Sequence, residues 1–118
     1  MKLEDLRLTA AKSRDAVYAG DLAALGRAMI ENTEAQARLH PDLVSAEGHQ
    51  VIELAQAHGA LGCKVNGAGG DGGSLTLLVG AESDKKRALV SALEVANSLF
   101  QPIPICLSRF GLRVWNSP

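Results

Sequence analysis

The segment Asn66-Gly67-Ala68-Gly69-Gly70-Asp71-Gly72-Gly73-Ser74 decides the fold, and it holds five of the chain's twelve glycines. Glycines lower stability unless the backbone needs a positive φ or must approach another group closely. A run of N–H groups with no side chains in the way forms a concavity that binds anions. The segment therefore predicts a turn that contacts phosphate or another polar ligand; the alternative is a floppy hairpin tip.

Strand-like segments flank this turn and recur near the C-terminus. Leu75, Leu77 and Val79 alternate on one face, as in a half-buried strand, and a shorter apolar segment precedes the turn. Prolines allow no helix just before a third alternating segment, and Phe110-Gly111 turns the chain into a fourth. The four predicted strands are 61–66, 74–79, 103–107 and 112–115.

Helical spacing dominates the first half of the chain. Gly20 fits the end of a first helix, Asp21 and Ser45 are N-cap residues of the next two, and Gly59 ends the third. A fourth helix is expected from Ser83 or Asp84, with an inward face made of Ala88, Leu89, Ala92, Ala96 and Leu99. The order predicts an α+β fold, an antiparallel sheet with helices packed on one face.

Composition narrows the class of protein. The 118 residues are 47% apolar, enough to bury the core of one domain, and the net charge of −1 with 3% aromatic residues argues against nucleic acid or a membrane as partner. Cys63 and Cys106 form no CxxC pair, which favours reduced thiols in a cytoplasmic protein. We expect no signal peptide and no membrane-spanning stretch.

Three familiar glycine motifs do not account for the turn. A Walker A loop requires Lys and then Ser or Thr after its last glycine, whereas Gly72 is followed by Gly73-Ser74. The spacing GxGxxG occurs as Gly67, Gly69 and Gly72, but a strand rather than a helix follows it. A protein-kinase glycine loop would need further motifs that this short chain lacks.

The stretch GALGCKVNGAGGDGGS, residues 59–74, resembles the third motif of the GHMP small-molecule kinases, GA-x-G-x-K-x-x-GAGGGG followed by an apolar strand. The resemblance extends over about 3–115, through Gly20-Asp21-Leu22 and Leu39-His40-Pro41. His40-Pro41 and Lys64-Val65-Asn66 are similar to the sugar-kinase members, such as the fucose and heptose-phosphate kinases.

The resemblance implies that residues 1–118 are the C-terminal domain of such a kinase, with a ferredoxin-like, four-stranded antiparallel sheet. It places the turn beside nucleotide phosphates and substrate, so that the phosphate- or substrate-binding residues are Asn66, Gly67, Ala68, Gly69, Gly70, Asp71, Gly72 and Gly73. It also implies ATP and Mg²⁺ as cofactors and a small sugar as substrate.

The family's N-terminal half, with its P-x-x-x-G-L-G-S-S-A phosphate loop, has no counterpart here. Phosphoryl transfer needs a phosphate cradle, Mg²⁺ and a positioned nucleophile, and one glycine turn cannot supply all three. We therefore expect that this chain contains no catalytic residue. By itself it should neither catalyse phosphoryl transfer nor bind a cofactor tightly. The expected partner is the N-terminal kinase half, in the same or a separate chain, and a homo-oligomer is a further expectation because half a protein exposes apolar surface.

For several residues, a functional and a structural interpretation both remain open. Asp71 departs from the family pattern and is either a contact to a sugar hydroxyl or metal, or a turn residue that tolerates left-handed backbone. Lys64 and Asn66 are either ligand contacts or parts of the strand and turn. His40, His49 and His58 lack metal-binding spacing, so no metal site is expected, and His40 is expected to be a structural cap.

Two other function classes remain open on these residues. One is a stand-alone ferredoxin-like module that binds a small anion or regulates another protein. The other is a degenerate fragment that only oligomerises. The coding frame upstream of Met1 distinguishes the kinase from the module: a continuous frame with the phosphate-loop motif favours the kinase, and a genuine start codon with no neighbouring half-gene favours the module.

Overall fold

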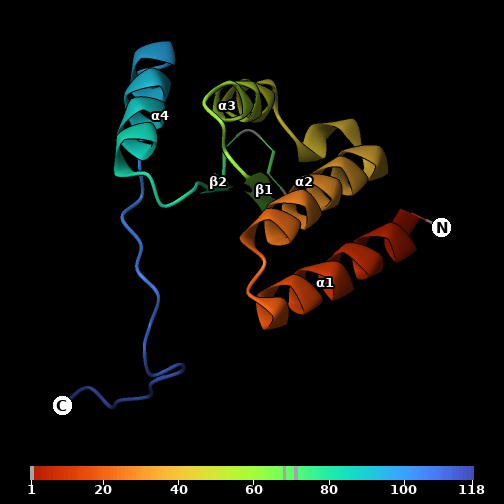
Figure 1. Cartoon of the computed structure of the whole chain (residues 1–118), viewed down its shortest axis with the longest axis vertical. Coiled ribbons are helices and arrows are strands. Elements are labelled where there is room, and N and C mark those ends of the chain that lie inside the picture. The colour runs from red at the N-terminus through yellow and green to blue at the C-terminus, as the bar shows by residue number, and fades with distance from the viewer. Residues whose placement is uncertain (1, 68, 71) are drawn as a thin grey trace.

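The computed structural model describes residues 2–67, 69–70 and 72–118, and Figure 1 shows its elements in chain order. The helical first half comprises α1 (Lys2–Ala19), α2 (Leu22–Leu39), the short 3-10 helix η1 (Pro41–Leu43) and α3 (Ala46–Ala57). Strands β1 (Gly62–Asn66) and β2 (Ser74–Leu78) follow, and then helix α4 (Ser83–Ala96). Within the described part of the chain, no helix combines the length and apolarity that crossing a bilayer requires.

Three predicted helix boundaries, at Gly20, Asp21 and Ser45, are confirmed by their caps. Gly20 has φ 67° just after α1, which is the left-handed conformation that ends many helices. The side chain of Asp21 accepts a hydrogen bond from the Ala24 N–H at 2.9 Å, and Ser45 Oγ accepts one from the Gly48 N–H at 3.0 Å. Helix α4 begins at Ser83 as expected, although Glu82 before it makes no side-chain cap.

The two strands form an antiparallel pair whose register runs from Gly62 opposite Leu78 to Asn66 opposite Ser74. Successive side chains of a strand point to opposite faces, so Cys63 and Val65 share one face, and both are buried. Cys63 joins Ala55 of α3 and Leu89 of α4 in the apolar core. Partly buried residues from the same elements and their flanks complete it: Ile52, Ala60, Leu77, Val79 and Leu93.

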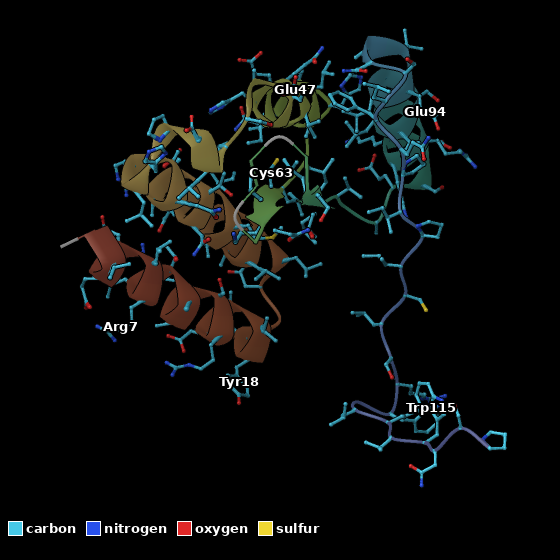
Figure 2. All side chains as sticks on the ribbon, turned by 180° about the vertical axis from the view of Figure 1, so that it is seen from behind. Arg7, Tyr18, Glu47, Cys63, Glu94 and Trp115 are labelled. Carbon is cyan, nitrogen blue, oxygen red and sulfur yellow. The ribbon has the colours of Figure 1, made fainter. Side chains whose placement is uncertain are left out.

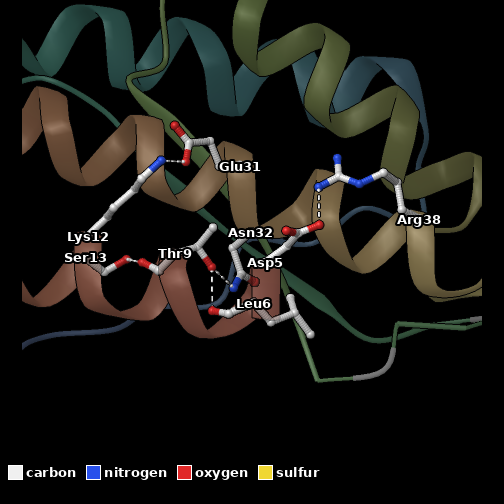
Figure 3. A network of polar contacts seen from close by, with 8 residues as sticks. All are labelled: Asp5, Leu6, Thr9, Lys12, Ser13, Glu31, Asn32 and Arg38. Atoms are coloured by element: carbon white, nitrogen blue, oxygen red, sulfur yellow. Dashed lines mark hydrogen bonds and ion pairs between the residues drawn. The ribbon is translucent and has the colours of Figure 1, made fainter. Parts of the chain in front are cut away.

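Helix α1 lies along α2 and is joined to it by polar side chains (Figure 3). Asn32 of α2 donates to the buried Thr9 hydroxyl at 2.7 Å. Ion pairs join Lys12 to Glu31 on one side and Asp5 to Arg38 at 3.4 Å on the other. The α1–α2 contact therefore relies on small and polar groups, while Leu3, Leu8, Val17 and Tyr18 are exposed.

The prediction of a ferredoxin-like, four-stranded antiparallel sheet is wrong. Among the described residues the sheet has two strands, and the segments 103–107 and 112–115 are extended without a strand partner. Alternation makes a segment suitable for pairing, but a strand forms only where a neighbour accepts its hydrogen bonds. Pro102 and Pro104 also remove two N–H groups from this region.

The C-terminal segment consequently leaves its apolar side chains in water. Ile103, Ile105 and Leu107 are 67%, 82% and 100% exposed. Trp115, the last residue of the fourth predicted strand, is 79% exposed and lies far from the helices (Figure 2). The radius of gyration is 15.5 Å, whereas a compact domain of this length has roughly 13.5 Å. The predicted turn at Phe110-Gly111 is present, with Gly111 at φ 63°.

The predicted inward face of α4 is only partly confirmed. Leu89 is buried and Ala92 is half-buried. Ala88 and Ala96 are exposed, and Leu99 lies beyond the end of the helix and is also exposed. Among the residues that the structure describes, no further strand lies beside the sheet. One turn of α4 is therefore enough to cover the core edge, and the rest of that face meets solvent.

Candidate functional site

The glycine turn joins β1 to β2 and adopts a backbone that other residues rarely take. Gly67, Gly69, Gly70 and Gly73 have φ values of 62°, 68°, 72° and 90°. Residues with a side chain are strained in this left-handed region, whereas glycine adopts it without strain. The four values explain why the sequence concentrates glycine here. Of the predicted site residues, Ala68 and Asp71 lie outside the described residues.

Part of the turn is open to a ligand and part is packed. A Cβ built on Gly67, Gly70 or Gly72 would meet no heavy atom within 4 Å among the described residues other than the chain neighbours. A Cβ on Gly69 would instead lie 2.2 Å from the Leu43 carbonyl oxygen. The middle of the turn therefore packs on η1, and a Cβ on Gly73 would lie 3.2 Å from the Gly69 carbonyl oxygen. Gly67, Gly70 and Gly72 leave the backbone free for close approach by another molecule.

The β1 side of the turn is anchored to helix α2 by side chains. Gln36 Nε2 donates to the Gly67 carbonyl oxygen at 2.6 Å, and Gln36 Oε1 accepts from Lys64 Nζ at 3.0 Å. One helical turn earlier, the Thr33 hydroxyl donates to the Cys63 carbonyl oxygen and accepts from the Val65 N–H, both at 3.2 Å. The conformation of β1 and of the first turn residue is therefore tied to α2.

Asn66 bridges the two strands at the base of the turn. Its Nδ2 donates to Ser74 Oγ at 3.1 Å, directly across the pair, and to Thr76 Oγ1 at 3.0 Å. Thr76 Oγ1 donates in return to Asn66 Oδ1 at 3.2 Å. Such cross-strand contacts fix the register at a sheet end. Asn66 therefore has a structural function, which was one of its two readings.

Lys64 brings positive charge to the base of the turn. Its Nζ donates to Gln36 Oε1 and to the Val65 carbonyl oxygen. Desolvation by partial burial lowers the pKa of this ammonium below its usual value. Both partners are uncharged oxygens, so they bond to the ammonium without compensating its charge. The Lys64 charge therefore favours an anion nearby.

A hollow of about 550 Å³ lies beside the turn and is lined by Pro41, Asp42, Val44, Ser45, Ala46, Glu47 and Gly70. It brings the turn next to the N-terminus of α3, where free N–H groups favour anions. Asp42 and Glu47 oppose that effect with negative charge. The hollow therefore suits a neutral, hydroxyl-bearing group better than a phosphate.

The remaining candidates have structural explanations. His40 Nδ1 accepts from the Asp42 N–H at 3.2 Å, so its expected capping role is confirmed. His49 and Cys63 line a smaller, mainly apolar hollow of about 190 Å³ between α2 and α3 that the turn does not reach. In the ranges that the structure describes, no three His, Cys, Asp or Glu side chains gather closely enough to hold a metal ion.

Comparison with known proteins relates this chain to the GHMP-family kinases. The similar solved structure is a crystal structure of L. major mevalonate kinase in complex with R-mevalonate, with a TM-score of 0.68 and 28% sequence identity. The similarity covers 80% of this chain and 28% of the mevalonate kinase chain, so the present chain spans well under half of that protein. No family model and no curated protein matches the sequence.

The comparison supports the resemblance to the GHMP kinases, but it does not support the sugar-kinase members in particular. The neighbour is named for mevalonate. The residues that suggested a sugar kinase, His40 and Asn66 among them, form caps and cross-strand bonds in this structure. The kinase relationship therefore rests on the fold and the glycine motif together.

Sequence reasoning missed Gln36. Helical spacing in the first half of the chain does not single this residue out. A signal was present, because Thr33 and Gln36 are two polar residues three positions apart, which places both on the buried face of α2. Buried polar side chains are normally hydrogen-bonded, so such a pair indicates a bonded partner across the interface.

Proposed function

We propose that this chain is the C-terminal domain of an ATP-dependent GHMP-type kinase, in which the glycine turn meets phosphate groups. The observation that carries the proposal is the left-handed backbone of Gly67, Gly69, Gly70 and Gly73, held between two strands and anchored to α2. The likeness to a mevalonate kinase supports it through fold and sequence together.

Two features of the turn would stabilise a bound anion: open backbone N–H groups and one positively charged side chain. Glycine N–H groups with no Cβ in front of them can approach phosphate oxygens directly. The partly desolvated Lys64 ammonium adds a favourable charge from the base of the turn. The phosphate-contacting set is therefore Gly67, Gly70, Gly72 and Gly73, together with Lys64. Gly69 has the supporting role of packing the turn on Leu43.

The described residues suit the phosphates of ATP better than they suit Mg²⁺. The turn suits the phosphates of ATP, because the backbone at Gly67, Gly70 and Gly72 is open and the Lys64 ammonium lies at the base of the turn. For Mg²⁺, carboxylate or hydroxyl ligands would come from elsewhere, since the described residues offer no cluster of three ligands. ATP, when bound, supplies the phosphoryl group. We therefore assign the metal ligands, the acceptor's base and the second phosphate loop to an N-terminal kinase half.

For the acceptor we propose the hydroxyl of a small molecule, and a sugar in particular on the resemblance of His40-Pro41 and Lys64-Val65-Asn66. The hollow beside Gly70 supports a hydroxyl-bearing group, because the carboxylates of Asp42 and Glu47 can accept hydrogen bonds from hydroxyls there and the Ser45 hydroxyl can donate or accept one. Both cysteines are free thiols, which supports a reducing, cytoplasmic setting.

The test is a titration of the ¹⁵N-labelled full chain with inorganic pyrophosphate, followed through the glycine amides. We expect the amides of residues 67, 69, 70, 72 and 73 to shift with saturation. Gly20 and Gly59 serve as internal controls, because they share the positive φ but lie at helix ends away from the turn. Shifts of equal size at the controls, or none in the turn, would overturn the proposal.

A second candidate is a small-anion-binding module that acts without a kinase half. It is favoured by the fact that the turn's anchors, Gln36, Lys64 and Asn66, all lie within this chain. The two functions differ in an ATP-consumption assay with the protein encoded by the complete upstream frame. ATP-dependent phosphorylation of a hydroxyl substrate identifies the kinase. Pyrophosphate binding without any phosphorylation identifies the module.

A further inference from the structure

Gln36 is a buried polar residue that none of the sequence motifs explains. Only 7% of its surface is exposed, and it is the last of the buried residues along α2, near the C-terminal end of that helix. Burying a carboxamide costs free energy unless both its ends are hydrogen-bonded. Here both ends are bonded, Nε2 to the Gly67 carbonyl oxygen and Oε1 to Lys64 Nζ.

The two partners allow the carboxamide one orientation. A backbone carbonyl can only accept and an ammonium can only donate, so Nε2 must face Gly67 and Oε1 must face Lys64. Among unbranched side chains of this length, glutamate at neutral pH lacks the donor and methionine lacks both groups. The pair of contacts therefore specifies glutamine at position 36.

Both partners belong to the phosphate-contacting set. Gly67 is the first residue of the turn, and fixing its carbonyl fixes the plane of the peptide group that follows. Lys64 carries the positive charge at the base, and the Gln36 oxygen holds its ammonium beside the strand. One side chain thus sets both the direction of the turn and the place of its charge.

We propose that Gln36 is the positioning residue of the glycine turn, holding the Gly67 carbonyl and the Lys64 ammonium so that the turn is preorganised for an anionic ligand. The inference rests on the proposed function, since it takes that ligand to be phosphate-like. Glycine loses more conformational freedom on ordering than any other residue. A turn ordered in advance loses less of that freedom when a ligand binds, and the ligand binds more tightly.

The test compares two variants at Gln36 with a matched variant on the same helix. Gln36→Met keeps the length and removes both contacts, whereas Gln36→Glu keeps an acceptor for Lys64 and removes the donor to Gly67. Thr33→Val is the control, because Thr33 is equally buried and also bonds to the β1 backbone, but it does not touch the turn. The readouts are the ¹H–¹⁵N heteronuclear NOE of the turn glycines and the pyrophosphate Kd.

For Gln36→Met we expect lower NOE values at the turn glycines of the free protein and pyrophosphate binding weakened roughly fivefold, the factor of one net hydrogen bond. Thr33→Val should lower the urea midpoint but leave the NOE values and the Kd within about twofold. In Gln36→Glu the new carboxylate also pairs with Lys64, so its Kd reports two changes, whereas its NOE values report the lost contact to Gly67. A similar drop of the NOE values in Gln36→Glu therefore assigns the ordering to Gly67 and decides the matter if the methionine variant does not fold.

The outcomes separate this inference from the proposed function. If the wild-type chain binds pyrophosphate and both Gln36 variants keep its NOE values and Kd, Gln36 has no positioning role while the proposed function stands. If the wild-type chain binds no pyrophosphate, the proposed function fails. The NOE comparison then still shows whether Gln36 orders the turn.

Discussion

Gly26 of α2 and Gly62 of β1 lie in direct backbone contact: a Cβ on Gly62 would lie 2.5 Å from the Gly26 Cα. Only two residues without side chains allow a helix and a strand to approach this closely. The contact brings α2 near enough for Thr33 and Gln36, about two and three helical turns further along, to reach the backbone of β1 and the turn.

We therefore predict that Gly26→Ala strongly destabilises the chain. The new Cβ would lie 2.1 Å from the Leu61 carbonyl oxygen, which is backbone and cannot rotate away. Overpacking of this kind costs about 3 kcal/mol, despite alanine's better helix propensity. Gly48→Ala in α3 is the matched control, since its Cβ would meet two side-chain atoms, the Ser45 Oγ at 3.3 Å and the Val44 Cγ1 at 3.5 Å, and no backbone. Urea unfolding should show a change within about 1 kcal/mol for the control; equal losses would contradict the prediction.

A second pair of variants separates backbone strain from ligand binding. Gly70 and Gly20 have similar φ values of 72° and 67°, and neither would place a Cβ within 4 Å of another described group. Alanine at either position should cost about 1 kcal/mol of folding stability. Gly70→Ala alone should also weaken pyrophosphate binding, by about tenfold, because it displaces an open N–H of the turn. If both variants bind like wild type, Gly70 is no contact.

The third prediction concerns alkaline pH. Burial raises the pKa of the Cys63 thiol above its ordinary 9.0. Above pH 9 the unfolded chain therefore loses this proton while the folded chain keeps it, and stability falls with rising pH. Lys64 acts in the opposite sense, because its lowered pKa lets the folded state lose a proton before the unfolded state does, between that pKa and 10.5.

Urea unfolding between pH 8 and 10.5 checks both terms. Cys63→Ala should remove the falling contribution, so that the variant gains stability relative to wild type as the pH rises. Lys64→Met should remove the rising contribution and make the fall steeper. Parallel pH profiles for all three proteins would show that neither group titrates differently in the folded and unfolded states.

The fourth prediction is self-association through the C-terminal segment. Large apolar side chains from Ile103 to Trp115 are two-thirds or more exposed, which exceeds what a monomer usually leaves in water. Light scattering should show a mass that rises with concentration. The emission of Trp115, the chain's one tryptophan, should shift to shorter wavelength at the same concentrations. A chain shortened to residues 1–100 should stay monomeric; a monomeric full chain with unshifted emission speaks against the idea.

Local chemistry made the helices and the turn predictable from sequence. Asp21, Ser45 and Gly20 act within a few residues of their position, so their capping roles follow from residue type. The hairpin from Gly62 to Leu78 is also local, because seven residues separate its strands. For the same reason the concentration of glycine between Asn66 and Ser74 marked the site.

Non-local pairing limited the remaining predictions. Ile103 and Ile105 alternate as strand residues do, but nothing in that pattern states whether a partner strand is present. Gln36 acts on Gly67 across 31 positions of sequence. Its role depends on the Gly26–Gly62 approach, which brings the helix close enough and has no local signature. The family resemblance indicated the turn correctly, and it overstated the sheet.

The polar contact between α1 and α2 gives the molecule an order of opening. Thr9, Asn32 and the flanking ion pairs are groups that water can replace with little loss, and salt weakens the charged ones. Helix α1 can therefore detach from α2 as a unit, without exposing the residues around Cys63. Hydrogen exchange would proceed from the two ends of the chain inward, and the amides nearest the β1–α2 junction would be the last to exchange.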